Sequence, residues 1–200
     1  MAALWLALLA AGCCHVNRLA AQPAPITEVQ LQQLDDPVAS LHFTRKMNSR
    51  TKQLVGPLLR TNRAVLAFDD LIQELAGGRL RQAIADQLPQ VLARELGWQR
   101  GDQGAILVIE PDELVFTAKD QQTPVTLIWR LRVGLCRSAD EALIWRRCID
   151  WRQQLGGLSM LELLHMNEPQ RQRLLRELVS GLGAHLVRLL IEDGGQPAGA

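Results

Sequence analysis

The sequence predicts an α+β fold, a two-layer sandwich in which two long helices cover one face of a mainly antiparallel sheet. Three successive segments between residues 105 and 151 are dense in apolar side chains, and the middle one alternates them with polar ones, as half-covered strands do. Two longer segments, 80–96 and 168–192, repeat apolar residues every three or four positions, as amphipathic helices do. A chain of 200 residues is long enough for one domain with a sizeable core.

The composition is that of an ordinary globular protein, with 48% hydrophobic and 22% charged residues. The formal net charge is +1. Proteins that bind nucleic acid in general carry a strong basic excess, so we expect no nucleic-acid partner.

The chain begins with an uninterrupted apolar run, Ala2 to Gly12. As a helix this run covers about 17 Å, against roughly 30 Å of bilayer hydrocarbon. It is therefore too short to span a membrane comfortably and is typical of the hydrophobic region of a signal peptide.

The run ends at Ala10-Ala11-Gly12-Cys13, which resembles the lipobox of bacterial lipoproteins. The resemblance implies cleavage before Cys13, diacylglycerol on its thiol and a further acyl chain, such as palmitate, on its new amino group. Several acyl chains anchor a protein stably. Cys14 stands where an Asp favours inner-membrane retention, so the resemblance implies a periplasm-facing protein of the outer membrane. The alternatives are an ordinary secretory signal or a buried N-terminal helix.

The predicted organisation is a signal peptide (1–12), a lipidated cysteine with a tether (13–36), an α/β domain (37–193) and a frayed tail (194–200). Pro23 and Pro25 disfavour helix, and glutamines dominate residues 30–33, which together indicate a tether. A packed N-terminal arm is the alternative.

Two early segments of the domain are weakly patterned. Residues 40–44 are predicted to form a short edge strand, and residues 48–60 at most a short helix. Residues 63–70 fit either a buried strand or a helix whose stripe runs on to Leu75. We expect a strand, because it would pair with the following helix in a βα unit.

The helix over residues 80–96 is well marked, with Gly97 suited to end it and Trp98 to contact it. Pro89 predicts a kink. Three strands should follow at 105–117, 124–136 and 142–151, with a bulge at 110–112 and a hairpin turn at 137–141.

Two capping boxes predict the closing helices, one from Ser159 to Glu162 and one from Asn167 to Gln170. The second helix should run to about residue 192. Gly181 and Gly183 inside it predict close packing, since glycine weakens a helix. The predicted order is β–α–β–β–β–α.

No motif for catalysis, phosphate binding or metal binding is found, so we expect no enzyme, no cofactor and no metal. Cys136 and Cys148 lack zinc-site spacing, and the hairpin register predicts that they are too far apart to bond to each other. The acidic cluster Glu110, Asp112 and Glu113 is read as a solvated bend rather than an acid/base pair.

One arginine constellation stands out. Alternation in residues 124–136 places Arg130 and Arg132 on the uncovered face, and a hairpin loop of odd length would bring Arg146 to the same face. Guanidinium groups bind phosphates and carboxylates, so this face is a candidate site for an anionic partner. The alternative is a solvated face balanced by carboxylates of the preceding strand.

The segments 80–84 (Leu-Arg-Gln-Ala-Ile), Gly97-Trp98, 105–110 and Leu127-Ile128-Trp129 resemble the ABC-type transport auxiliary lipoproteins, including the PqiC-like ones. The resemblance implies a non-enzymatic accessory of an envelope transport or assembly machine, held to the membrane by its lipid, with an envelope protein complex or further copies of itself as partners. The alternatives are a periplasmic lipid- or glycan-binding protein, to be identified by an apolar cavity between helix and sheet, and a hydrolase with an unrecognised site.

Overall fold

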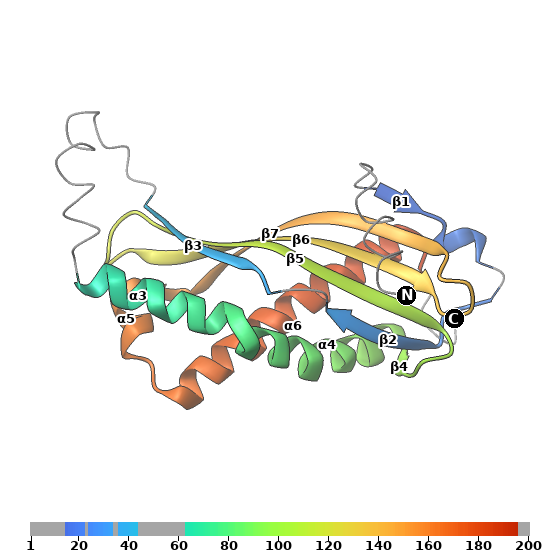
Figure 1. Cartoon of the computed structure of the whole chain (residues 1–200), viewed down its shortest axis with the longest axis horizontal. Coiled ribbons are helices and arrows are strands. Elements are labelled where there is room, and N and C mark those ends of the chain that lie inside the picture. Colours follow the sequence, from blue (N-terminus) through green and yellow to red (C-terminus); the bar gives the residue numbers. More distant parts are fainter. Residues whose placement is uncertain (1–14, 23, 34–35, 44–62, 196–200) are drawn as a thin grey trace.

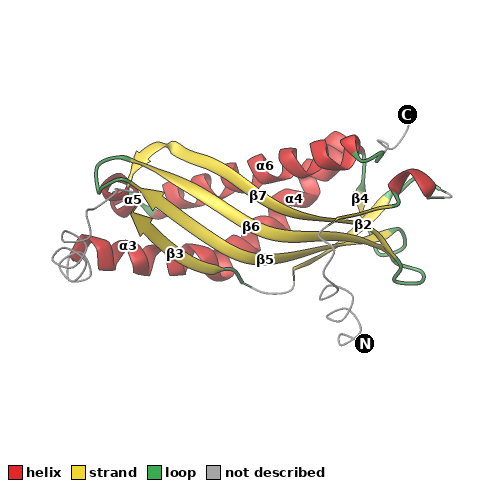
Figure 2. Ribbon diagram, turned by 90° about the horizontal axis from the view of Figure 1, so that it is seen from above, coloured by secondary structure: helices red, strands yellow, loops and turns green. Residues whose placement is uncertain are grey.

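The computed structural model describes residues 15–22, 24–33, 36–43 and 63–195. These residues form a seven-stranded sheet whose described helices lie together on one face, as Figures 1 and 2 show. The predicted α+β class and two-layer arrangement are confirmed. The expectations for the signal peptide, for Cys13 and for a helix at 48–60 fall outside the described residues.

Three long antiparallel strands make the centre of the sheet: β5 (Ala105–Ala118), β6 (Pro124–Arg137) and β7 (Leu143–Ser159). The alternation seen in the sequence decides which way β6 faces, because its apolar positions are buried towards the helices. These positions are Val125, Leu127, Trp129, Leu131, Val133 and Leu135. The predicted hairpin turn is present, with the Arg137 amide donating to the Ala142 carbonyl.

A bulge divides β5 into two halves with different neighbours, where its register with β6 shifts between Pro111 and Glu113. The first half pairs in parallel with β2 (Glu28–Gln33) and the second half with β3 (Val38–Phe43). The bulge was predicted, and β3 corresponds to the strand expected at 40–44. The parallel pairing was not foreseen.

Two short strands complete the sheet, β1 (His15–Asn17) beside β7 and β4 (Gln99–Arg100) beside β2. The tether prediction is therefore wrong for much of 13–36, because β1 and β2 belong to the sheet and Leu19 and Val29 are buried. Glutamines at positions 30 and 32 face solvent while Val29 is buried. The tether prediction counted the polar residues of this segment and overlooked that they alternate with apolar ones.

The strand expected at 63–70 is also wrong, because these residues begin the helix α3 (Arg63–Glu74). Phe68, Leu71 and Ile72 are buried on one helical face, and Leu75 continues it. A π-helical segment, Leu75–Arg79, joins α3 to α4 (Leu80–Leu96). The break lies at Gly77, with φ −74° and ψ −142°, while α4 is continuous through Pro89.

The helix ends follow the predicted signals. Gly97 adopts a left-handed conformation (φ 70°) after α4, and Trp98 is buried next to it. Both capping boxes form, at Ser159 before α5 (Met160–His165) and at Asn167 before α6 (Glu168–Glu192).

The core lies between the sheet and the helix layer and includes three fully buried tryptophans, Trp98, Trp129 and Trp145. The close packing predicted for α6 is present. A Cβ atom on Gly181 would lie 2.9 Å from the Trp151 ring on β7, and one on Gly183 would lie 3.0 Å from Val91 on α4. The two glycines therefore let α6 approach the sheet on one side and α4 on the other.

Candidate functional site

The arginine-bearing face is the surface of β6 and β7 opposite the helices, and it holds Arg130, Arg132 and Arg146. Arg130 lies opposite Asp150, Arg132 opposite Cys148 and Gly134 opposite Arg146. Residues directly opposite each other in antiparallel strands share a face. The structure thus brings the three predicted arginines to one face of the sheet.

Carboxylates of the neighbouring strand pair with two of these arginines. Arg130 Nη1 lies 2.5 Å from Glu113 Oε2, and Arg132 Nη2 lies 2.5 Å from Glu110 Oε1. Asp150 on β7 lies 3.9 Å from Arg130 Nε, at its Oδ2 atom. The face therefore mixes both signs of charge, which supports the solvated alternative over an unbalanced basic patch.

The ion pairs also explain the acidic cluster on β5. Glu110 and Glu113 flank the bulge and both point to the arginine-bearing face, while Asp112 is exposed at the bulge itself. A bulge changes which residues share a face, so simple alternation along β5 could not have matched each glutamate to its arginine.

The three arginines differ in accessibility. The side chain of Arg130 is 49% exposed and that of Arg132 is 36% exposed, whereas Arg146 as a residue is only 3% exposed. An external partner would therefore meet Arg130 and Arg132 first, and each would reach that partner already paired with a glutamate.

A second charged cluster ties the end of α6 to β7. Asp193 accepts hydrogen bonds from Trp145 Nε1 at 2.7 Å and from Arg147 Nε and Nη2 at 2.8 and 2.6 Å. The hydrogen bond from Arg147 is the main cause that holds the pKa of the Asp193 carboxyl below its ordinary value, aided by that from Trp145. Sequence reasoning missed this cluster, since Asp193 is one acidic residue at a helix end.

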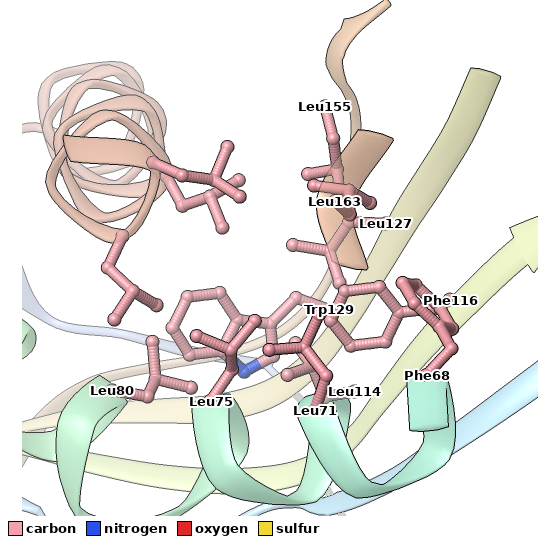
Figure 3. Close-up of a pocket in the computed structure, with 13 residues that line it drawn as sticks. Phe68, Leu71, Leu75, Leu80, Leu114, Phe116, Leu127, Trp129, Leu155 and Leu163 are labelled. Carbon is pink, nitrogen blue, oxygen red and sulfur yellow. The ribbon is translucent and has the colours of Figure 1, made fainter. Parts of the chain in front are cut away.

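An apolar cavity of about 20 Å³ lies between the helices and the sheet. Figure 3 shows Phe68 and Leu71 of α3, and Leu75 of the π-helical segment that follows it, pointing towards the β6 side of the cavity, where Trp129 lies. Its lining side chains carry no charge. A volume of this size holds about one water molecule, far less than an acyl chain needs.

A larger hollow, of about 330 Å³, opens to solvent between α4 and the edge formed by β2 and β4. Pro89 of α4, Leu31 of β2 and Arg100 of β4 are among its lining residues. Its size is at the lower end of small-molecule sites, but it does not enclose a ligand on all sides.

The two cysteines of the sheet are in different states. Cys136 is a free thiol, and burial is the main cause that raises its pKa to about 11, so it is protonated at neutral pH and unreactive. Cys148 is disulfide-bonded. The expectation that these two cysteines are not bonded to each other is confirmed, and Cys148 lies opposite Arg132, four residues along β6 from Cys136.

Among residues 15–22, 24–33, 36–43 and 63–195, no group of three or more His, Cys, Asp or Glu side chains is placed to hold a metal ion. Within the same ranges, no helix is both long and apolar enough to cross a bilayer.

No family model matches the chain, and no curated protein matches it significantly. Solved structures that it resembles include a protein from Xanthomonas campestris of the DUF330 family, at 12% identity and a TM-score of 0.36, covering 89% of this chain and 95% of that one. Lipoprotein GNA1162 from Neisseria meningitidis matches at 14% identity and a TM-score of 0.23, covering 81% and 99%. A putative neuraminyllactose-binding hemagglutinin homologue from Helicobacter pylori matches at 11% identity and a TM-score of 0.29, covering 84% and 89%. At these scores the likenesses carry no argument about function.

Proposed function

We propose that this protein is a non-enzymatic bacterial lipoprotein, anchored through Cys13 and serving as an accessory of an envelope transport or assembly machine. The observation that carries the proposal is the apolar run that ends at Ala10-Ala11-Gly12-Cys13. The outer membrane is the proposed site, with the domain facing the periplasm.

The state of the cysteines supports an extracytoplasmic location. Cys148 is disulfide-bonded, and structural disulfides form and persist in oxidising compartments such as the bacterial periplasm. A signal peptide delivers a chain to that compartment, so two independent features agree.

The interior of the domain favours an accessory over a lipid carrier. The apolar cavity between helices and sheet is about 20 Å³, whereas sites for small molecules usually measure about 300–1,000 Å³. The acidic groups that had the best prospects for acid/base chemistry, Glu110 and Glu113, are each engaged by an arginine.

Anchoring is tested by labelling cells with an alkyne analogue of palmitate. The gene is expressed with any coding sequence that precedes residue 1, alongside the Cys13→Ser variant and a Cys136→Ser control. We expect label and membrane association for the unaltered protein and for the control, and neither for Cys13→Ser. Equal labelling of all three, or of none, contradicts the anchor.

The accessory role is tested with a strain that lacks the gene. We expect a defect in the envelope barrier, measured as sensitivity to detergent or to a large antibiotic, that the unaltered gene corrects and Cys13→Ser does not. Full correction by Cys13→Ser would separate the function from the membrane and overturn the proposal.

A further inference from the structure

The outer side of β2 is paired with β4 over its first two residues only. β4 lies opposite Glu28 and Val29, whereas β2 runs on to Gln33 and pairs with β5 along its inner side. Within the described ranges, no strand lies beside β2 on the outer side beyond Val29. This unpaired stretch, residues 30–33, is termed the β2 edge.

The main-chain groups of the β2 edge include a donor and an acceptor that point outwards. The Gln99 amide donates to the Thr27 carbonyl at 2.8 Å. The Gly101 amide donates to the Val29 carbonyl at 3.2 Å. Alternate residues of a strand direct these groups to the same side, so Leu31 is the next to present its N–H and C=O outwards. Among the residues that the structure describes, no main-chain group bonds to Leu31 on that side, which leaves it open to another strand.

The hollow of about 330 Å³ opens onto the β2 edge, because Leu31 is one of its lining residues. Figure 1 shows β2, β4 and α4 close together at one end of the molecule. Ala85 and Pro89 of α4 also line the hollow. They are four residues apart and therefore lie on the same face of the helix. Both side chains are short and apolar, so this wall leaves room for the side chains of an added strand.

Arg100 supplies a cation to the same hollow. It lies opposite the buried Val29, so its side chain is on the face of the sheet that α4 covers. Arg81 of α4 pairs with Asp36 at 3.1 Å. By contrast, no ion pair joins Arg100 to any carboxylate in the described part of the chain. Arg100 is therefore available to a carboxylate from outside the domain.

We infer that the β2 edge binds a short extended segment of a partner polypeptide, one that carries an apolar residue beside an acidic one. The segment continues the line of β4, with its main chain bonded to Leu31, its apolar side chain against Pro89 and its carboxylate at Arg100. When a strand is added to a sheet edge, main-chain hydrogen bonds give affinity and pockets for side chains give specificity. Asp102, two residues after Arg100, also lines the hollow and disfavours a second acidic residue.

The place of the β2 edge in the sheet suits a partner of an anchored protein. β1 and β4 stand at the two ends of the strand order, so an anchor near β1 leaves the β2 edge accessible. The nature of the partner rests on the proposed accessory role, but binding itself does not. Cys13→Ser should bind the segment like the unaltered protein, so the anchor and this site can fail separately.

The test begins with random peptides displayed on phage and selected on the full-length protein, purified from cells in detergent. Empty micelles remove background binders. We expect the enriched peptides to share an apolar residue next to Asp or Glu. A labelled synthetic copy is then the probe for fluorescence anisotropy. N-methylation of its alternate amides should weaken binding about tenfold or more, because main-chain hydrogen bonds are lost. No enriched peptide, or no effect of N-methylation, overturns the inference.

Two variants locate the site. Arg100→Gln removes the charge and should weaken binding of the probe about three- to tenfold, as loss of a partly exposed ion pair does. Leu31→Pro removes the outward N–H but keeps the pairing with β5, which uses the main chain of residues 30 and 32, and should weaken binding about tenfold or more. Arg176→Gln, at an exposed arginine of α6, is the control and should change the affinity less than about twofold.

Circular dichroism shows whether each variant is folded. Unchanged affinity in a folded Arg100→Gln or Leu31→Pro protein means that the peptide binds elsewhere and overturns the inference. If Leu31→Pro does not fold, the N-methylated probe decides the main-chain pairing, and Arg100→Gln decides the place.

Discussion

The carboxylate of Asp193 joins the end of α6 to β7. Its side chain is only 9% exposed, and it accepts hydrogen bonds from two residues of β7 at the point where α6 ends. Both donors lie on the face that packs against the helices, and Trp145 is fully buried. Asp193 therefore fixes the last turn of α6 to the strand that also pairs with β1.

Asp193→Asn should lower the free energy of unfolding by about 1–2 kcal/mol at pH 7, because Arg147 and Trp145 lose a charged acceptor. The folded pKa of Asp193 is lowered, so its contribution is present above the unfolded pKa, about 3.9, and disappears as pH falls through the folded value. Denaturant unfolding from pH 7 to pH 3 measures this. Asp112→Asn, at the exposed bulge, is the matched control. A constant difference between Asp193→Asn and the unaltered protein over this range contradicts the expectation.

The arginine-bearing face allows a contrasting prediction at the same scale. Arg130 is half exposed, and exposed ion pairs contribute about 0–1 kcal/mol that salt screens. Arg130→Gln should therefore lower the free energy of unfolding by less than about 1 kcal/mol, and by less again in 1 M salt. A loss above about 2 kcal/mol would mean that the pair with Glu113 stabilises the fold. Failure of the Arg130→Gln, Arg132→Gln double variant to correct the deletion phenotype would instead support an anionic partner.

At the scale of elements, the sequence predicted those helices and strands whose residue pattern is visible within the segment itself. β6 was predictable because its alternation persists over the whole strand, and α5 and α6 because each begins with a capping box. The close approach of α6 to its neighbours was predictable because Gly181 and Gly183 weaken the helix. The residues that these glycines contact were not predictable.

Other elements depend on partners distant in the chain. The second half of β7 includes Arg-Gln-Gln-Leu-Gly-Gly (152–157), a polar stretch with no strand pattern. β6 nevertheless pairs with β7 through Gln154 and, after a shift in register, again at Ser159. For α3, a window of eight residues holds too few turns to separate helix from strand. The sequence suggested carboxylates on the arginine-bearing face only as an alternative interpretation. It could not pair each glutamate with Arg130 or Arg132, because that pairing depends on the bulge.

Gly181→Ala and Gly78→Ala should have opposite effects. Alanine favours a helix over glycine by about 1 kcal/mol, but at position 181 its Cβ would meet the Trp151 ring at 2.9 Å, and overpacking typically costs about 1–3 kcal/mol. At Gly78 no atom lies within 4 Å of the added Cβ. We expect Gly181→Ala to lower the melting temperature and Gly78→Ala to raise it slightly, as followed by circular dichroism. Two shifts of the same sign would refute the packing argument.

At the scale of the whole molecule, the N-terminal arm is part of the domain. β1 and β2 lie towards opposite edges of the sheet, on either side of the three long strands. The arm also contributes two buried apolar side chains, Leu19 and Val29. A boundary at residue 37, as the sequence suggested, would leave the first half of β5 and the start of β7 without these neighbours.

A truncated protein that begins at Pro37 should therefore fail to fold. Burial of Leu19 and Val29 alone contributes roughly 3–6 kcal/mol, against about 5–15 kcal/mol for a whole domain. The removed strands would also expose edges that favour aggregation. A matched variant that begins at Cys14 should unfold like the unaltered protein. Thermal denaturation checks both. An unchanged transition in the protein that begins at Pro37 would mean that residues 13–36 are a tether after all.

The small number of residues between Cys13 and β1 limits how far the domain could extend from a membrane anchor. A free spacer from residue 13 to residue 36 could extend to roughly 80 Å, whereas the two residues from Cys13 to His15 reach about 7 Å at most. With acyl chains on Cys13, the sheet edge at β1 and β7 would stay against the headgroups and the domain could not swing out across the periplasm. Any machine that it serves would then have to come to the membrane surface to meet it.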